Sequence, residues 1–307
     1  MRPLRPVEPN LRRAANALLA GELVVLPTET VYGLAADAAN PEAVAKIFEA
    51  KGRPSDNPLI VHVAQMEAVE LWSDHMPKGM LKLARAFWPG PLTVVVPKNP
   101  RVPSIVTAGL DTVAIRIPSH SLALAVLEMT GMGLAMPSAN PFMGLSPTRA
   151  DRIDPSVAAH VACIIDGGPC RVGIESTVLD LSDGTPKILR PGTITAEEIE
   201  AVIGTVEVVD SAERKAPGMY KRHYAPAVPA LLVKKAADGD AGLVFGYTTN
   251  ETQIQMPSDP VNYAKKLYVA LSDLEGRGVE RIMIEEPPTG TEWAGVWDRV
   301  SKATAAL

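Results

Sequence analysis

Short apolar runs alternate with amphipathic stretches along the first two-thirds of the chain, and turns rich in Gly and Pro separate them. Short apolar runs between turn residues are typical of buried strands, whereas apolar positions three and four apart indicate helices. The pattern predicts strands over residues 23–26, 59–63, 92–96, 112–117, 162–165, 176–179 and 188–189. It predicts helices over residues 11–19, 41–50, 77–87, 122–129 and 196–202. This alternation indicates an α/β or mixed-sheet domain.

A second, smaller unit follows a segment without periodicity. Residues 211–226 lose the apolar pattern and are basic and flanked by proline, which is typical of a linker. Beyond it, the pattern predicts strands over residues 230–233, 242–246 and 281–284, and helices over 261–274 and 293–303. We therefore expect a catalytic domain over residues 1–208, a linker over 209–228 and a small α/β domain over 229–307.

Composition narrows the class of protein. Of the 307 residues, 47% are hydrophobic and 21% are charged, which is typical of a folded globular chain. The net charge of -5 argues against a broadly basic surface for nucleic acid, although it allows a local basic pocket. No apolar stretch approaches the roughly 20 residues that span a bilayer, and no signal-peptide core follows Met1. We expect a cytoplasmic protein.

The cysteines and the searched metal and nucleotide motifs give no evidence of a disulfide, a metal site or a P-loop. Cys163 and Cys170 could pair, but a reducing compartment and the turn between them favour free thiols. The chain has no CxxC, no HExxH and no convincing metal cluster. It has neither GxxxxGK[ST] nor GxGxxG, so ATP would have to bind without a P-loop.

Candidate chemistry lies where predicted strands and helices end. The predicted strand over residues 23–26 leads into Pro27–Leu34, which carries hydroxyls and a carboxylate. The helix over residues 41–50 ends at the cations Lys51 and Arg53, which could hold an anion. Strand ends are where α/β proteins keep ligands. Taken singly, these pieces also fit a turn and a solvated helix end, but their ordered combination favours a binding site.

Later segments also carry polar or charged residues in or next to predicted strands. Alternation within the strand over residues 112–117 sends Arg116 to the face opposite Ile115, so its cation needs either a partner or solvent. The loop at Ser138 could bring N–H groups to phosphate oxygens or could be a simple Asn-Pro turn. Ser176 and Arg190 flank apolar strands and could face one cavity. His62 closes a strand, where an imidazole is more often a packing residue than a base.

Together these motifs resemble the YrdC-domain proteins, and among them the two-domain threonylcarbamoyl-AMP synthases. The matching segments are residues 27–34, 51–54, 57–62, 87–93, 137–140, 165–168, 175–177 and 189–192. The resemblance implies a YrdC-like twisted mixed sheet with flanking helices, followed by a small Rossmann-like α/β domain. It also implies that the linker folds back over the active site.

The resemblance implies a nucleotidyltransferase that converts L-threonine, bicarbonate and ATP into threonylcarbamoyl-AMP and pyrophosphate. By resemblance, threonine and its carbamate would be held by Thr30, His62, Arg116, Met136 (through its backbone) and Ser176. ATP would be held by Lys51, Arg53, Asn57, Thr112, Ser138, Ser146, Arg190 and the linker residue Tyr224. No covalent intermediate is required, and no residue is assigned as a catalytic acid or base.

The same resemblance suggests cofactors and partners. Mg²⁺ should accompany ATP, with water and phosphate oxygens as its main ligands and Asp166 as a candidate. The product would pass to the transferase machinery that modifies tRNA beside the anticodon, without stable nucleic-acid binding or membrane attachment by this chain. The alternatives are an RNA-binding module and a carbamoyl-transfer domain, which the net charge and the short, cysteine-poor chain disfavour.

Overall fold

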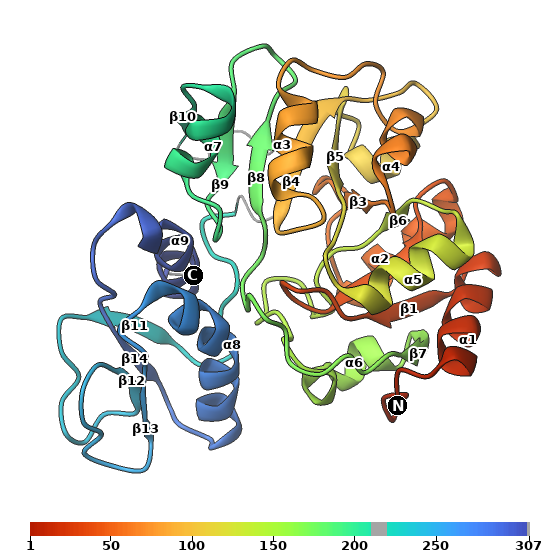
Figure 1. The fold of residues 1–307 in the computed structure, drawn as a ribbon. Helices are drawn as coiled ribbons and strands as arrows, with labels where there is room; N and C mark the ends of the chain where they lie inside the picture. Colours follow the sequence, from red (N-terminus) through yellow and green to blue (C-terminus); the bar gives the residue numbers. More distant parts are fainter. Residues whose placement is uncertain (210–219, 306–307) are drawn as a thin grey trace.

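The computed structural model describes residues 1–209 and 220–305, which form two α/β units (Figure 1). The first unit is built on a ten-stranded sheet with the order β10-β9-β8-β4-β5-β3-β6-β2-β1-β7. Parallel and antiparallel neighbours are mixed, as in the pairs β3–β5 and β4–β5. The strands are β1 (Leu23–Leu26), β2 (Gly33–Asp37), β3 (Ile60–His62), β4 (Leu92–Pro97), β5 (Thr112–Arg116), β6 (Leu134–Ala135), β7 (Val161–Ile164), β8 (Thr177–Asp180), β9 (Lys187–Arg190) and β10 (Glu207–Val208).

Helices cover both faces of this sheet because its strands are apolar on both sides. In β1, Val24 and Leu26 pack in one core cluster with α1 and α5, whereas Leu23 and Val25 join the larger cluster with the remaining helices. The α-helices are α1 (Glu8–Leu19), α2 (Pro41–Lys51), α3 (Met80–Phe87), α4 (Ser104–Thr107), α5 (Ser121–Thr130), α6 (Pro155–Ala158) and α7 (Ala196–Ile203). Short 3-10 turns are η1 (Met66–Leu71) and η2 (Ala150–Arg152).

The second unit is a parallel four-stranded sheet in the order β11-β14-β12-β13, with its helices packed against it. Its core includes Tyr263, Leu271 and Ile284. The elements are β11 (Ala230–Val233), β12 (Gly242–Val244), β13 (Gln253–Gln255), α8 (Pro260–Gly276), β14 (Ile282–Glu285), η3 (Thr291–Trp293) and α9 (Ala294–Ala303). Figure 1 shows α8 and α9 on the side of this unit that faces the first domain.

The predicted fold class is confirmed, and most expected strands and helices are present within a few residues. Helix α3 begins at Met80 rather than residue 77, because Gly79 adopts a positive φ of 90° that no helix continues. Helix α1 begins earlier than predicted, at Glu8, with Pro9 in its first turn. Cys163 and Cys170 are buried free thiols, as expected. No helix in residues 1–209 and 220–305 is long and apolar enough to cross a membrane.

The interdomain linker lies partly outside the described residues. Its predicted first part includes residues 210–219, whereas residues 220–229 run between the two domains without forming a helix or strand. In this stretch Tyr224 is buried and has a positive φ of 56°. The linker therefore brings its second half against the first domain, beside the pocket described next.

Candidate active site

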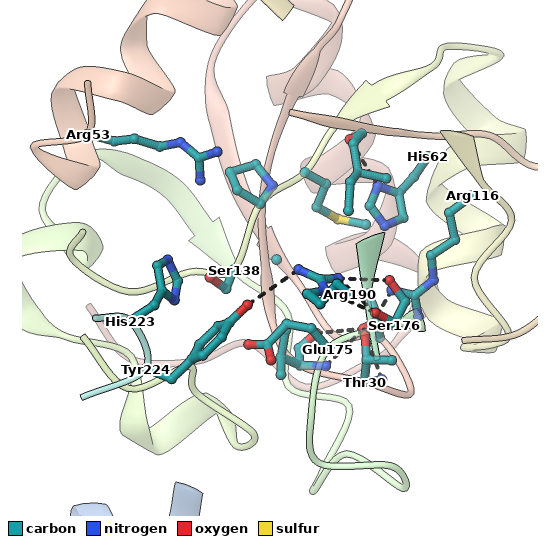
Figure 2. A pocket seen from close by; sticks show the side chains of 16 residues that line it. Thr30, Arg53, His62, Arg116, Ser138, Glu175, Ser176, Arg190, His223 and Tyr224 are labelled. Carbon is teal, nitrogen blue, oxygen red and sulfur yellow. Dashed lines mark hydrogen bonds between the residues drawn. The ribbon is translucent and has the colours of Figure 1, made fainter. Parts of the chain in front are cut away.

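A pocket opens where several strands and loops of the first domain end (Figure 2). Residues from several segments that are far apart in the sequence converge on it. Those that line it are Thr28, Thr30, Val31, Gly33, Arg53, Ile60, His62, Arg116, Met136, Pro137, Ser138, Glu175, Ser176, Arg190, His223 and Tyr224. Three arginines make its lining strongly cationic.

One end of the pocket is organised around Arg116 at the end of β5. Its Nη2 donates to Glu29 Oε1 at 2.6 Å, its Nη1 to Thr30 Oγ1 at 3.0 Å and its Nε to the carbonyl of Gly90 at 3.2 Å. Burial opposes the charge on Glu29, but the Arg116 guanidinium outweighs it and lowers the pKa of Glu29. A guanidinium has five N–H donors, so two remain for a ligand.

The neighbouring strand supplies His62, which is in register with Arg116 on the parallel pair β3–β5. Burial lowers the pKa of His62 to about 3, and the Arg116 charge adds to this shift. His62 is therefore a neutral imidazole at physiological pH. It can donate or accept one hydrogen bond per ring nitrogen but cannot act there as a cation.

Ser176 and Arg190 form the floor of the pocket, where β8 begins and β9 ends. The Ser176 hydroxyl lies 2.7 Å from Thr93 Oγ1 and accepts from Arg190 Nη2 at 3.1 Å. Arg190 also donates to the Ser176 carbonyl and, at 3.4 Å, to the hydroxyl of Tyr224. Figure 2 shows the Tyr224 ring reaching from the linker toward Arg190. The Arg190 guanidinium thus contacts both Ser176 and the linker residue Tyr224.

The other end of the pocket contains Arg53, which follows the left-handed C-cap Gly52 of α2. Its Nη2 donates to the carbonyls of Asn57 and Pro58 at 3.1 and 2.7 Å. Arg53 Nε and Asn57 Nδ2 are buried and have no hydrogen-bond partner among the described residues. Unpaired buried donors are costly, so these two groups indicate a place where a ligand supplies acceptors.

Lys51 supports the loop that carries Ser138. Its ammonium donates to the carbonyls of Ser138 and Asn140 and is buried. Burial, together with the charge of Arg53, lowers the pKa of Lys51 well below its usual value. Lys51 therefore fixes the position of the Ser138 loop relative to Arg53.

Glu175 is the one carboxylate among the residues lining this pocket, and the second domain surrounds it. It accepts from Ser146 Oγ, from Tyr268 on α8 at 2.9 Å and from Arg299 Nε on α9 at 2.7 Å. Burial raises the pKa of Glu175, but the charges of Arg299 and Arg190 outweigh it and leave the pKa at about 2. The carboxylate is therefore ionised and accepts three side-chain hydrogen bonds.

Comparison with known proteins identifies this arrangement. The Sua5/YciO/YrdC family model, described as telomere recombination, matches residues 16–192. The model of the threonylcarbamoyl-AMP synthase C-terminal domain matches residues 194–305. The chain belongs to the threonylcarbamoyl-AMP synthase family. It is accordingly an enzyme of the nucleotidyltransferase type.

Relatives match across both domains. The threonylcarbamoyl-AMP synthase of Pyrococcus abyssi is 40% identical over 320 residues, covering 96% of this chain and 94% of the relative. The Bacillus subtilis enzyme is 42% identical over 323 residues, covering 96% and 93%. The crystal structure of P. abyssi Sua5 with L-threonine matches with a TM-score of 0.92 at 39% identity, covering 97% of this chain and 95% of that one.

The structure brings most of the predicted site residues of this family member together. Nine of them line the pocket: Thr30, Arg53, His62, Arg116, Met136, Ser138, Ser176, Arg190 and Tyr224. Lys51, Asn57 and Ser146 lie directly behind it, holding Ser138, Arg53 and Glu175 respectively. Thr112 lies apart from these groups, at the beginning of β5, and stays a predicted ATP contact on the same strand face as Arg116.

Three polar pocket residues were not assigned from the sequence: Thr28, Glu175 and His223. Thr28 bridges Thr30 and the Val31 carbonyl within one turn, which its position in the first motif could have suggested. Burial lowers the pKa of His223 to about 3 against the opposing charge of Glu175. The role of Glu175 could not be found from local sequence, because its partner Arg299 lies 124 positions away.

The described residues do not form a protein cage for a metal. No group of three or more His, Cys, Asp or Glu side chains suited to a metal occurs in residues 1–209 and 220–305. Asp166 accepts from the Gly168 amide at 2.9 Å and is not among the pocket residues. Glu175 already accepts three side-chain hydrogen bonds.

Proposed function

We propose that this protein makes threonylcarbamoyl-AMP from L-threonine, bicarbonate and ATP, releasing pyrophosphate. The observation that carries the proposal is a single pocket with Arg116 and His62 at one end and Arg53 and Ser138 at the other (Figure 2). A family of threonylcarbamoyl-AMP synthases in which one solved member is complexed with L-threonine supports it.

The Arg116 end suits an amino acid. The two N–H donors that Arg116 has left can form a fork on the threonine carboxylate. Glu29 and the carbonyl of Gly90 hold the guanidinium in place, so little conformational entropy is lost on binding. The neutral His62 and the hydroxyls of Thr30 and Ser176 offer further hydrogen bonds. We assign threonine and its carbamate to these residues, with Met136 contributing its backbone.

The Arg53 end suits a nucleotide. Arg53 Nε and Asn57 Nδ2 need acceptors, and ATP supplies them in its phosphate oxygens and its base. Thr112 and Arg116 are four residues apart on one face of β5, a separation of roughly 13 Å, so one strand can serve both substrates. We assign ATP to Arg53, Asn57, Thr112, Ser138, Ser146, Arg190 and Tyr224, with Lys51 fixing the Ser138 loop.

The reaction then needs positioning more than covalent catalysis. Threonine and bicarbonate first give the N-carboxylate of threonine and water. An oxygen of this carbamate attacks the α-phosphorus of ATP, and the bond from that phosphorus to pyrophosphate breaks. Holding both substrates in one pocket makes the attack effectively unimolecular. We assign to Arg190, which donates to the hydroxyls of Ser176 and Tyr224, the stabilisation of charge on the reacting phosphate.

We treat Mg²⁺ as part of the MgATP substrate, held by phosphate oxygens and water. The product would serve tRNA threonylcarbamoyl transfer, carried out by a separate transferase, which follows from the family reaction. Direct RNA binding is the weaker candidate, because the chain has a net charge of -5. A carbamoyl-transfer role rests only on a shared fold, since full-length HypF matches with a TM-score of 0.53 at 19% identity.

Pyrophosphate release by the purified protein tests the proposal. With MgATP, L-threonine and bicarbonate all present, we expect steady release of pyrophosphate and an acid-labile adenylate that contains threonine. Omitting threonine or bicarbonate should reduce the rate at least about tenfold, since no acceptor for the AMP forms. Release that continues unchanged without either of them would show that the chain is an ATP pyrophosphohydrolase of another kind.

A further inference from the structure

Helix α9 of the second domain places a buried cation against the pocket of the first. Arg299 is 0% exposed, and its Nε donates to Glu175 Oε2 at 2.7 Å. Its Nη2 donates to the Glu175 carbonyl at 3.0 Å and its Nη1 to the Pro191 carbonyl at 2.8 Å. One side chain thus fixes both the loop before β8 and the loop after β9.

The same guanidinium also contacts the linker. Its central carbon lies 5.0 Å from the centre of the Tyr224 ring, in cation–π geometry. One turn further along α9, the Lys302 carbonyl accepts from the His223 amide at 3.2 Å. Two pocket residues of the linker are therefore held by α9, next to Glu175.

Glu175 needs this cation because of where it lies. Its carboxylate lines the pocket together with Arg190 and Ser138, residues assigned to the phosphates of ATP. A buried carboxylate without a counter-ion would repel those phosphates and would compete with them for Arg190. With Arg299 present, the negative charge is already compensated before ATP binds.

We propose that Arg299 is a positioning residue for the ATP site, acting from the second domain through Glu175. The proposal rests on the proposed function, in which ATP is a substrate bound near Arg190. It gives the second domain a defined role in the reaction: it supplies the charge that makes the first domain's pocket suited to a polyanion. Arg299 touches neither substrate in this assignment, so its effect falls on ATP affinity rather than on the chemical step.

The test compares two interdomain ion pairs in the full-length protein. Arg299→Gln removes the pair with Glu175 and a second pair with Asp298, which keeps Lys302 as a partner. Arg152→Gln removes the surface pair with Asp273, 2.5 Å long, which also joins the first domain to α8. We expect Arg299→Gln to weaken MgATP binding, measured by calorimetry, at least about tenfold. The KM for ATP should rise by a similar factor. The KM for threonine should change less than about threefold. Arg152→Gln should leave the MgATP affinity and both KM values unchanged.

A second variant separates charge from packing. Removing both charges, in Glu175→Gln with Arg299→Gln, should recover most of the ATP affinity lost in the single Arg299→Gln variant, provided that both fold with similar melting temperatures. If Arg299→Gln and Arg152→Gln weaken ATP binding equally, or if the double variant is no better than Arg299→Gln, domain docking alone is responsible and the proposal is wrong.

ATP binding and turnover are measured separately, so the role of Arg299 and the proposed function are tested independently. If the wild-type protein binds MgATP but releases no pyrophosphate with threonine and bicarbonate, the proposed function is wrong while the comparison of ATP affinities still decides the role of Arg299. If Arg299→Gln does not fold, Tyr268→Phe, which removes only the 2.9 Å hydrogen bond to Glu175, is the milder variant. It should weaken ATP binding about twofold to fivefold, and unchanged binding would contradict the proposal.

Discussion

At the scale of single residues, two buried arginines at this pocket form ion pairs with buried carboxylates. Arg116 pairs with Glu29 at 2.6 Å, and Arg299 pairs with Glu175 at 2.7 Å. Backbone groups add to each pair: the Ser119 amide donates to the Glu29 carboxylate, and the Glu175 carbonyl accepts from Arg299. Such pairs add little net stability, but losing one partner costs about 3–5 kcal/mol because the other charge stays buried. Their effect is to hold each guanidinium in a fixed position.

Arg116→Lys tests the threonine assignment while keeping the charge that Glu29 needs. Lysine cannot form a two-pronged contact with a carboxylate, so we expect the KM for threonine to rise about tenfold or more. The KM for ATP should change less than about threefold, because ATP is assigned to other residues. Steady-state kinetics with each substrate varied in turn measures both. Arg149→Lys, at an exposed pair with Asp151, is the control.

An equal rise in both KM values for Arg116→Lys would show that Arg116 is wrongly assigned to threonine. The melting temperature must stay close to that of the wild type for this comparison, since Glu29 loses a hydrogen bond in the variant.

At the scale of elements, the second domain docks through a close approach of backbones. A Cβ added to Gly295 on α9 would lie 2.4 Å from the Gly192 carbonyl oxygen, just beyond β9. A Cβ on Gly192 would in turn lie 2.4 Å from the Thr177 amide nitrogen at the start of β8. These two glycines let α9 sit directly on the strand ends that carry Ser176 and Arg190.

Gly295→Ala therefore has two opposing effects. Alanine favours a helix over glycine by about 1 kcal/mol, but here its methyl group meets backbone that cannot move without shifting α9. We expect a net loss of about 1–3 kcal/mol in the free energy of unfolding. Gly276→Ala, at the end of α8, meets no atom within 4 Å and should be neutral or stabilising. Denaturant titration of both variants measures the difference. A stable Gly295→Ala variant would show that the contact at Gly192 is loose.

Apolar runs, rather than element length, decided which strands could be predicted. The strands over residues 23–26 and 230–233 are uninterrupted apolar runs of four residues, and they were predicted with the observed bounds. In contrast, β2, β6, β10 and β13 were not predicted, because none of them contains such a run. Helices α4 and α6 were missed because four residues make only about one helical turn.

At the scale of the whole molecule, the pocket joins residues from Thr28 to Tyr224. Residue chemistry alone could flag strand-end hydroxyls and cations one at a time, but it could not show that they share a cavity. Resemblance to a family supplied that grouping. The contact between Glu175 and Arg299 was beyond both, since nothing in the local sequence of either residue indicates a partner in the other domain.

Two buried neutral histidines should make the stability of the molecule depend on pH. Burial lowers the pKa of both His62 and His223 to about 3, below the ordinary value of 6.5 that they regain on unfolding. Their contribution to stability is full above pH 6.5 and is lost as the pH falls toward 3, because only the unfolded state takes up the proton. As the pH falls from 6.5 to 5, each histidine should lower the free energy of unfolding by about 2 kcal/mol.

Urea titrations at pH 7 and pH 5 measure this loss. His62→Gln should remove about half of it, whereas His160→Gln, at an exposed position, should leave it unchanged. A pH dependence that is the same in wild type and His62→Gln would mean that His62 is protonated in the folded protein.

The reach of Arg299 across the domain boundary also bears on how this family can diversify. Some relatives match less of the chain: the putative threonylcarbamoyl-AMP synthase of Mycobacterium tuberculosis aligns with 62% of this chain, and 88% of its own length is covered. A protein without α9 cannot neutralise a carboxylate at the position of Glu175 in this way. In a chain without an equivalent of α9, a carboxylate at this position would need a counter-ion from elsewhere.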